Sequence, residues 1–141
     1  MGLDQYARTA TKRGLKLREE IKAIENYEER ENFRKENRWN DEIQEIQYWR
    51  KHADLNEWMT RLAVERGVVK NAIDFNCVEM EITPADIDAL ERDLNEDALP
   101  QGAGFFWGRS QPEDRVDDES FIVKAREAFA EGKKVFYSCW W

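Results

Sequence analysis

The chain is poor in the residues on which many small proteins depend for stability or catalysis. It has two cysteines, one histidine and three prolines among 141 residues. Two cysteines do not make a disulfide framework, so we expect Cys77 and Cys139 to be reduced and mostly buried thiols. No apolar run approaches the roughly 18 residues of a membrane-spanning helix, so no membrane partner is expected.

The single histidine narrows the possible chemistry. Any Ser–His–Asp or Cys–His arrangement must use His52, and no carboxylate lies beside it in the sequence to orient it. One histidine and two distant cysteines lack the paired spacing of a zinc site. The phosphate-binding patterns GxxxxGK(S/T) and GxGxxG do not occur. We therefore expect no cofactor and no metal, and assign no catalytic residue.

Basic residues are also fewer than acidic ones. Lys and Arg number 22 against 30 Asp and Glu, which gives a net charge of −8. Because phosphate binding depends on clustered cations, no direct contact with nucleic acid is expected. The acidic stripe, within residues 74–97, contains Asp74, Glu79, Glu81, Asp86, Asp88, Glu91, Asp93, Glu96 and Asp97, with Arg92 as its one basic residue. Two interpretations stay open: a solvated face, or an imitation of DNA phosphates that a basic partner binds.

Alternation of apolar and polar residues predicts several strands. They are expected at residues 3–9, 43–49, 75–82 and 135–141. We expect an α+β fold in which helices pack on a small mixed or antiparallel sheet. Three of these strands and the segment around Phe105 are expected to form that sheet, while residues 43–49 lead into a helix.

Helical spacing and capping signals predict three packed helices. Residues 50–66 carry apolar residues at helical spacing, and Gly67 is placed to end that helix. Thr83 is a predicted N-cap, with Pro84 in the first helical position. Asp117 or Asp118 is expected to cap a last helix that ends near residue 132.

Residues 12–38 differ in composition from the rest of the chain. Charged side chains of both signs dominate, and the apolar stripe is thin. We predict a protruding helical arm, called the charged arm below, inserted after the first strand of a single domain that spans residues 1–141. The charged arm is either a contact element, for example in a homo-oligomer, or a solvated helix without a partner.

Aromatic residues are the most unusual feature that is present. They gather at residues 48–49, 105–107 and 136–141, and a strand at the end of the chain would carry rings on both faces. A small domain cannot easily bury both faces, so some rings are expected at an interface or pocket. The predicted contact residues are Tyr48, Trp49, Arg50, Lys51, Phe105, Phe106, Trp107, Arg109, Tyr137, Trp140 and Trp141.

Carboxylates keep an enzymatic interpretation open. An enzyme of unknown reaction would use Asp4, His52 or Asp118. Asp118 is also a good helix cap, and we favour that role over metal binding.

Several motifs occur in a fixed order along the chain. It opens with MGLDQY, continues with YWRK at residues 48–51 and GFFWG at residues 104–108, and closes with FYSCWW. This series resembles a family of small, uncharacterised bacteriophage and prophage proteins. Trp107 and Cys139 depart from the Phe and Ser usual in that family.

The resemblance implies where the protein acts rather than which reaction it catalyses. It implies a phage-encoded accessory protein in the cytoplasm of a bacterial host cell, acting by binding. The expected partner is a host or anti-phage defence protein that the chain inhibits. The alternative is a nucleotide-binding or nucleotide-sequestering protein, in which Phe106, Trp107, Tyr137 and Trp140 stack on a base and Arg50, Lys51 or Arg109 meets the phosphates.

Overall fold

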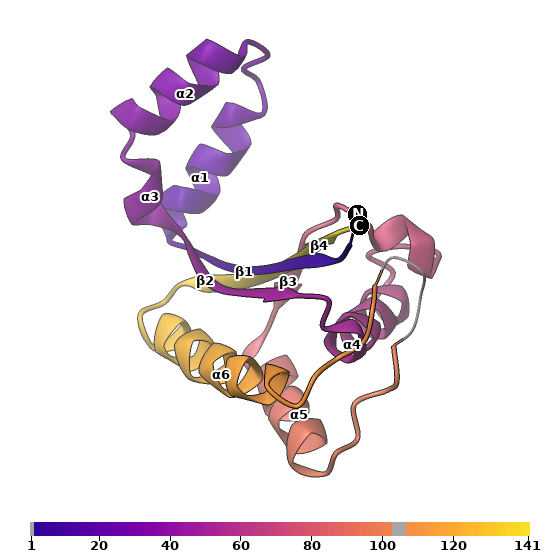
Figure 1. Cartoon of the computed structure of the whole chain (residues 1–141). Coiled ribbons are helices and arrows are strands. Elements are labelled where there is room, and N and C mark those ends of the chain that lie inside the picture. Colours follow the sequence, from indigo (N-terminus) through magenta and orange to yellow (C-terminus); the bar gives the residue numbers. More distant parts are fainter. Residues whose placement is uncertain (1, 103–106) are drawn as a thin grey trace.

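A computed structural model describes residues 2–102 and 107–141, and these residues form an α+β fold (Figure 1). The strands are β1 (Asp4–Ala10), β2 (Ile43–Arg50), β3 (Met80–Ile82) and β4 (Lys134–Trp140). The helices are α1 (Lys12–Ile21), α2 (Tyr27–Glu36), α3 (Trp39–Glu42), α4 (Ala53–Glu65), α5 (Pro84–Asn95) and α6 (Asp114–Ala130), with a 3₁₀ turn η1 (Ala72–Phe75). The predicted fold class is confirmed.

All pairings in the sheet are antiparallel, in the order β2-β1-β4-β3. The first and last strands of the chain lie side by side, with Asp4 opposite Trp140 and Ala10 opposite Lys134. The register of β1 against β2 shifts between Ala7 and Arg8, where Ile46 of β2 has no partner residue on β1. The segment around Phe105, expected in the sheet, lies outside the described residues.

Helices α4, α5 and α6 all lie on one side of the sheet (Figure 1). The inward residues of β1 and β4 alternate with outward ones, so Ala7, Val135 and Tyr137 join a core that includes Leu55, Ile87 and Phe121. Thr83 caps α5 as predicted: its Oγ accepts from the Asp86 N–H, and the Asp86 carboxylate accepts from the Thr83 N–H.

The charged arm rises on the opposite side of the sheet from α4, α5 and α6 (Figure 1). It contains two helices, α1 and α2, rather than one. Their N-caps are Thr11 and Asn26, which accept from the backbone N–H of Gly14 and Glu29. None of the residues of the charged arm belongs to the main core cluster, so the insertion has its own packing.

Four sequence predictions need correction here. Residues 43–49 were not expected in the sheet, but they belong to β2, which pairs with β1. Only Met80–Ile82 of the strand predicted at residues 75–82 is a strand, because Cys77 adopts a left-handed conformation (φ 64°) that interrupts extended backbone. Cys77 is also exposed, whereas Cys139 is buried as expected. The last helix begins at Asp114, with Glu113 at the N-cap, so Asp118 is not its cap.

No helix among the described residues is long and apolar enough to cross a membrane.

Candidate functional site

The predicted contact residues on the strands are divided between the two faces of the sheet, one covered by helices and one not. Trp49 and Tyr137 point toward the helices and are 1% and 0% exposed. Trp49 packs edge-on against Phe121, and Tyr137 stacks on Phe75. Expected at a contact surface, these two residues instead belong to the core, because their strands present them to the covered face.

The other face carries the remaining aromatic side chains of β1, β2 and β4, and no helix of the α4–α6 layer covers it. We call it the open face; its residues are Asp4, Tyr6, Arg8, Glu45, Tyr48, Arg50, Phe136, Ser138 and Trp140. Tyr48 and Trp140 are its most exposed rings, at 40% and 54%. This is where the predicted surplus of aromatic surface lies.

Neighbouring side chains hold these rings in place. The ring centroids of Tyr6 and Tyr48 are 5.3 Å apart, and the Arg8 guanidinium lies 4.7 Å from the Tyr6 centroid. The Tyr48 hydroxyl donates to Asp4, which raises the pKa of that hydroxyl, and Arg50 Nη1 donates to the same carboxylate at 3.1 Å. The open face is therefore ordered before any partner arrives.

The charged arm borders one end of the open face. The Arg18 guanidinium on α1 lies 4.3 Å from the centroid of the Phe136 ring and also pairs with Glu79. Phe136 is half-buried as a result. Helix α1 thus forms a side wall to the open face.

The remaining predicted contact residues gather near the end of the sheet where β1 begins and β4 ends. Trp107 packs edge-on against Trp141, with ring centroids 5.3 Å apart, and the stem of Lys51 lies against Gly108. Arg109 is exposed. Phe105 and Phe106 lie outside the described residues.

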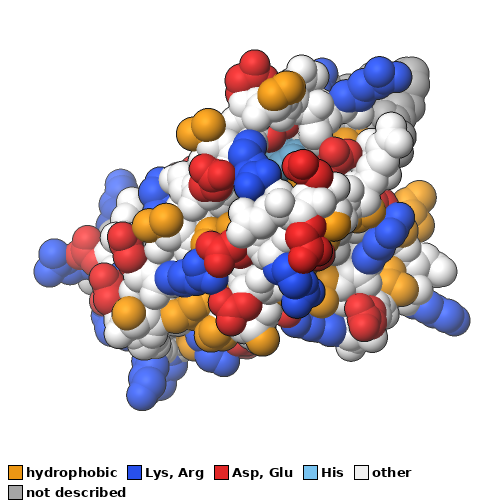
Figure 2. Space-filling model, turned by 90° about the horizontal axis from the view of Figure 1, so that it is seen from below, with side chains coloured by type: hydrophobic (Ala, Val, Ile, Leu, Met, Phe, Trp, Pro, Cys, Tyr) orange, Lys and Arg blue, Asp and Glu red, His pale blue; other side chains and the backbone are white. Residues whose placement is uncertain are grey.

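Most of the acidic stripe is paired with cations. Seven of its nine carboxylates form ion pairs, Glu79 with Arg18, Glu81 with Lys134, Asp86 with Arg66, Asp88 and Glu91 with Arg126, Asp93 with Arg92, and Asp97 with Arg115. The two carboxylates on Arg126 raise the pKa of its guanidinium. Acidic and basic side chains alternate over the face in Figure 2, so little of this stripe is an unbroken negative surface.

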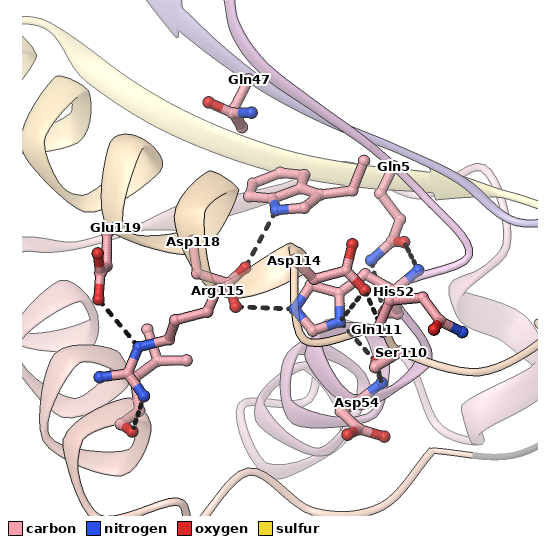
Figure 3. A network of polar contacts seen from close by, with 12 residues as sticks. Gln5, Gln47, His52, Asp54, Ser110, Gln111, Asp114, Arg115, Asp118 and Glu119 are labelled. Atoms are coloured by element: carbon pink, nitrogen blue, oxygen red, sulfur yellow. Dashed lines mark hydrogen bonds and ion pairs between the residues drawn. The ribbon is translucent and has the colours of Figure 1, made fainter.

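A chain of hydrogen bonds joins the N-cap of α4, helix α6 and the segment between α5 and α6 (Figure 3). His52 Nε2 lies 2.8 Å from Asp118 Oδ2, and His52 Nδ1 lies 2.6 Å from Ser110 Oγ. Trp49 Nε1 donates to the other oxygen of Asp118 at 3.0 Å. His52 and Asp118 are 3% and 1% exposed. The orienting carboxylate absent from the local sequence is thus supplied by α6.

Burial is the main influence on Asp118. Removal from water raises the pKa of its carboxyl group, and the nearby Asp114 acts in the same direction. The hydrogen bonds and charge of His52, and the bond from Trp49, act in the opposite direction. Asp118 is therefore a buried acceptor within a network rather than a helix cap.

An open depression of about 390 Å³ lies over this chain. Its lining residues include Asp54, Leu94, Leu99, Gln111 and Arg115 in addition to the three hydrogen-bonded residues. The pale blue of the only histidine is visible at the bottom of a hollow in Figure 2, with acidic side chains and a basic one around it. Sequence reasoning identified His52 and Asp118 separately but missed Ser110.

A second polar network lies deeper and fixes the start of α4. Gln5 Oε1 accepts from the His52 N–H at 2.9 Å, and Gln5 Nε2 donates to the His52 carbonyl and the Tyr137 hydroxyl. The Tyr137 hydroxyl donates to Asn56 Oδ1 at 2.7 Å. A glutamine at an inward position of β1 was the signal that could have revealed this network.

No family model, no curated protein and no solved structure matches the chain. The resemblance to phage proteins therefore stays a prediction. Within the described residues, no group of three or more His, Cys, Asp or Glu side chains is placed to hold a metal ion.

Proposed function

We propose that the protein acts by binding another protein on the open face, with helix α1 as a side wall. The observation that carries this proposal is the exposure of Tyr48 and Trp140, at 40% and 54%, on a sheet face outside the α4–α6 layer. Tyr, Trp and Arg are the residues that most often dominate the energetics of protein interfaces. An ordered aromatic face also loses little side-chain entropy on binding.

The charge pattern favours a protein partner over a nucleic acid. The cations on and around the open face are paired with carboxylates, Arg8 with Glu45, Arg50 with Asp4, Arg18 with Glu79 and Lys134 with Glu81. A nucleic-acid surface needs cations that are available to neutralise phosphates. A partner with mixed charge and an apolar centre suits such a face better.

A host protein or a component of an anti-phage defence system is the partner that we propose, and inhibition is the proposed outcome. This part rests on the ordered sequence motifs, whose resemblance to phage proteins implies a bacterial cytoplasmic setting. DNA mimicry is not part of the proposal, because the paired carboxylates of the acidic stripe leave few negative charges free to replace phosphates.

The nucleotide-binding alternative has less support. Of its four stacking rings, Tyr137 is buried and Phe106 lies outside the described residues. Trp107 packs against Trp141, which leaves Trp140 as the clearly exposed ring. No observation favours this alternative over a protein partner.

The experiment compares three tagged proteins in a lysate of bacterial host cells. They are the wild type, the Tyr48→Ala/Trp140→Ala double variant and a matched control, Val123→Ala, which removes an exposed side chain from α6. A protein captured by the wild type and the control but not by the double variant is purified. Its Kd is then measured by calorimetry.

We expect the double variant to bind at least about 30-fold more weakly, since one interface hot spot contributes about 2 kcal/mol or more. The control should bind like the wild type. Equal affinity of the wild type and the folded double variant would refute the role of the open face. The absence of any protein captured differentially would count against the function itself.

A further inference from the structure

The hydrogen-bond chain at the bottom of the depression ends in a hydroxyl group that faces the cavity. Ser110 is half-buried and lines the depression, whereas His52 and Asp118 behind it are nearly sealed from solvent. The Asp54 N–H, in the first turn of α4, donates to Ser110 Oγ at 2.9 Å. Ser110 Oγ therefore uses one lone pair to accept from a backbone N–H at the start of α4. The direction of its own hydroxyl hydrogen depends on its other partners.

The partners determine where that hydrogen goes. Asp118, when ionised, only accepts, so His52 Nε2 carries a hydrogen and donates to it. A neutral imidazole then has an unprotonated Nδ1, which accepts from the Ser110 hydroxyl at 2.6 Å. Every donor in the chain is satisfied by this arrangement, and all the bonds point from Ser110 toward Asp118. A serine that only capped α4 would need neither the histidine nor the buried carboxylate.

We propose that Ser110 is a nucleophile, activated by His52 and oriented by Asp118, that cleaves small uncharged acyl esters. The order hydroxyl, imidazole, carboxylate is that of serine hydrolases, with the two ring nitrogens exchanged. The exchange does not alter the proton transfer, because either nitrogen accepts a proton while the other donates. This activity is independent of the protein contact proposed for the open face.

The lining of the depression selects the substrate class. Four carboxylates, those of Asp54, Asp97, Asp114 and Asp118, line it against one cation, Arg115, so the depression disfavours anionic substrates. Leu94 and Leu99 offer an apolar wall for a short acyl chain. Apart from His52, the lining side chains that carry N–H groups are Gln111 and Arg115. Arg115 already donates to Glu119, to the Leu94 carbonyl and to Asn95. Gln111, whose Nε2 has only a long contact of 3.4 Å with the Arg109 carbonyl, is therefore the donor available to an oxyanion.

The reaction balances with water as the second reactant. Ser110 Oγ bonds to the ester carbonyl carbon while its proton passes to His52 Nδ1, and Asp118 stabilises the imidazolium. The carbon–oxygen bond to the leaving alcohol breaks, and that oxygen takes the proton from Nδ1. Water then attacks the acyl-serine, gives a proton to Nδ1 and releases a carboxylic acid. The proton returns to Ser110 Oγ, so one ester and one water yield one acid and one alcohol.

The first test uses the whole protein with p-nitrophenyl acetate and with a fluorophosphonate probe. We expect p-nitrophenol release above background and one probe adduct, mapped by mass spectrometry to Ser110. Ser110→Ala should lose both, with the hydrolysis rate at least about 100-fold lower. Ser120→Ala, on α6 and outside the lining of the depression, is the matched control and should keep both. A folded Ser110→Ala variant with unchanged hydrolysis, or an adduct at another residue, would overturn the proposal.

A second measurement covers the case in which replacement of His52 disturbs folding. In a Cys77→Ser background, the thiol of a Ser110→Cys variant should react with iodoacetamide at pH 6 at least about 10-fold faster than that of a Ser120→Cys variant, since an imidazole partner promotes the thiolate. Adding His52→Gln to the Cys77→Ser/Ser110→Cys variant gives a triple variant, in which the difference should disappear. Equal alkylation rates at positions 110 and 120 would contradict activation by His52.

Discussion

At the scale of single residues, the most informative position is Asp118. Its carboxylate is almost completely buried and holds both Trp49 and His52. In the sequence, Asp118 is an acidic residue near the start of a helix, where helix capping is the common role. Its actual role follows from the earlier start of α6, which turns Asp118 to the same inward side as Phe121, Ile122 and Ala125.

Asp118 gives the first prediction, which concerns pH. Burial raises the pKa of this carboxyl group in the folded protein, so the folded state binds the proton more tightly than the unfolded state does. The contribution of Asp118 to stability is therefore present below about pH 4 and is lost as pH rises through its folded pKa. We expect the free energy of unfolding of the wild type, relative to Asp118→Asn, to fall as pH increases above about 4.

Urea unfolding at several pH values measures that difference. Exposed Glu119→Gln on the same helix is the control, and its difference from the wild type should show a weaker trend. A difference between the wild type and Asp118→Asn that stays constant from pH 4 to pH 8 would contradict the prediction.

The two cysteines give a second prediction. Burial raises the pKa of the Cys139 thiol to about 12, whereas Cys77 is exposed. Because the thiolate is the reactive form, a thiol reagent at pH 8 should modify Cys77 rapidly and Cys139 only after unfolding. Absorbance with a disulfide reagent should therefore report one thiol in the native protein and two in denaturant. Two rapidly reacting thiols in the native state would contradict the prediction, because they would show that the reagent reaches Cys139 on β4 without unfolding.

At the scale of elements, α5 was the most predictable helix. Its N-terminal signals are local: Thr83, Pro84 and Asp86 form a capping box with proline in the first turn. The strand predicted before α5 was too long. It is interrupted at Cys77, which has a left-handed backbone and whose N–H donates to the Cys139 carbonyl. That partner is distant in sequence and cannot be predicted from local periodicity.

The third prediction concerns the cap of α5. Thr83→Ala should lower the free energy of unfolding by about 1 kcal/mol, because the Asp86 N–H loses its acceptor. Thr83→Ser keeps the hydroxyl and should stay close to the wild type. Denaturant titration measures both. A similar loss in the two variants would mean that the methyl group rather than the cap matters.

At the scale of the whole molecule, the charged arm is a structural insertion between two paired strands. Ala10 and Ile43, the strand residues that flank the insertion, are opposite each other in the sheet. The main core cluster contains no residue of the charged arm. The rest of the chain should therefore fold without it. Whether copies of the protein associate through the charged arm stays a prediction.

The fourth prediction tests this independence. Residues 11–42 are replaced by Asn-Gly, which suits a two-residue hairpin turn. We expect a cooperative thermal transition, and a circular dichroism spectrum with less helix, because α1, α2 and α3 are lost. The full-length protein is the control. A shortened chain without a cooperative transition would show that the contact of Arg18 with Phe136 and Glu79 is essential to the sheet.

Local periodicity and capping signals in the sequence determined the α+β class, the extent of α4, the start of α5 and the presence of excess aromatic side chains. Only the tertiary structure decided which sheet face those side chains occupy, since alternation defines two faces but not which one the helices cover. It also brought His52 to Ser110 and Asp118, which are 58 and 66 residues away. Contacts over such separations arise from the packing of α4 and α6 on the sheet, and no local pattern encodes them.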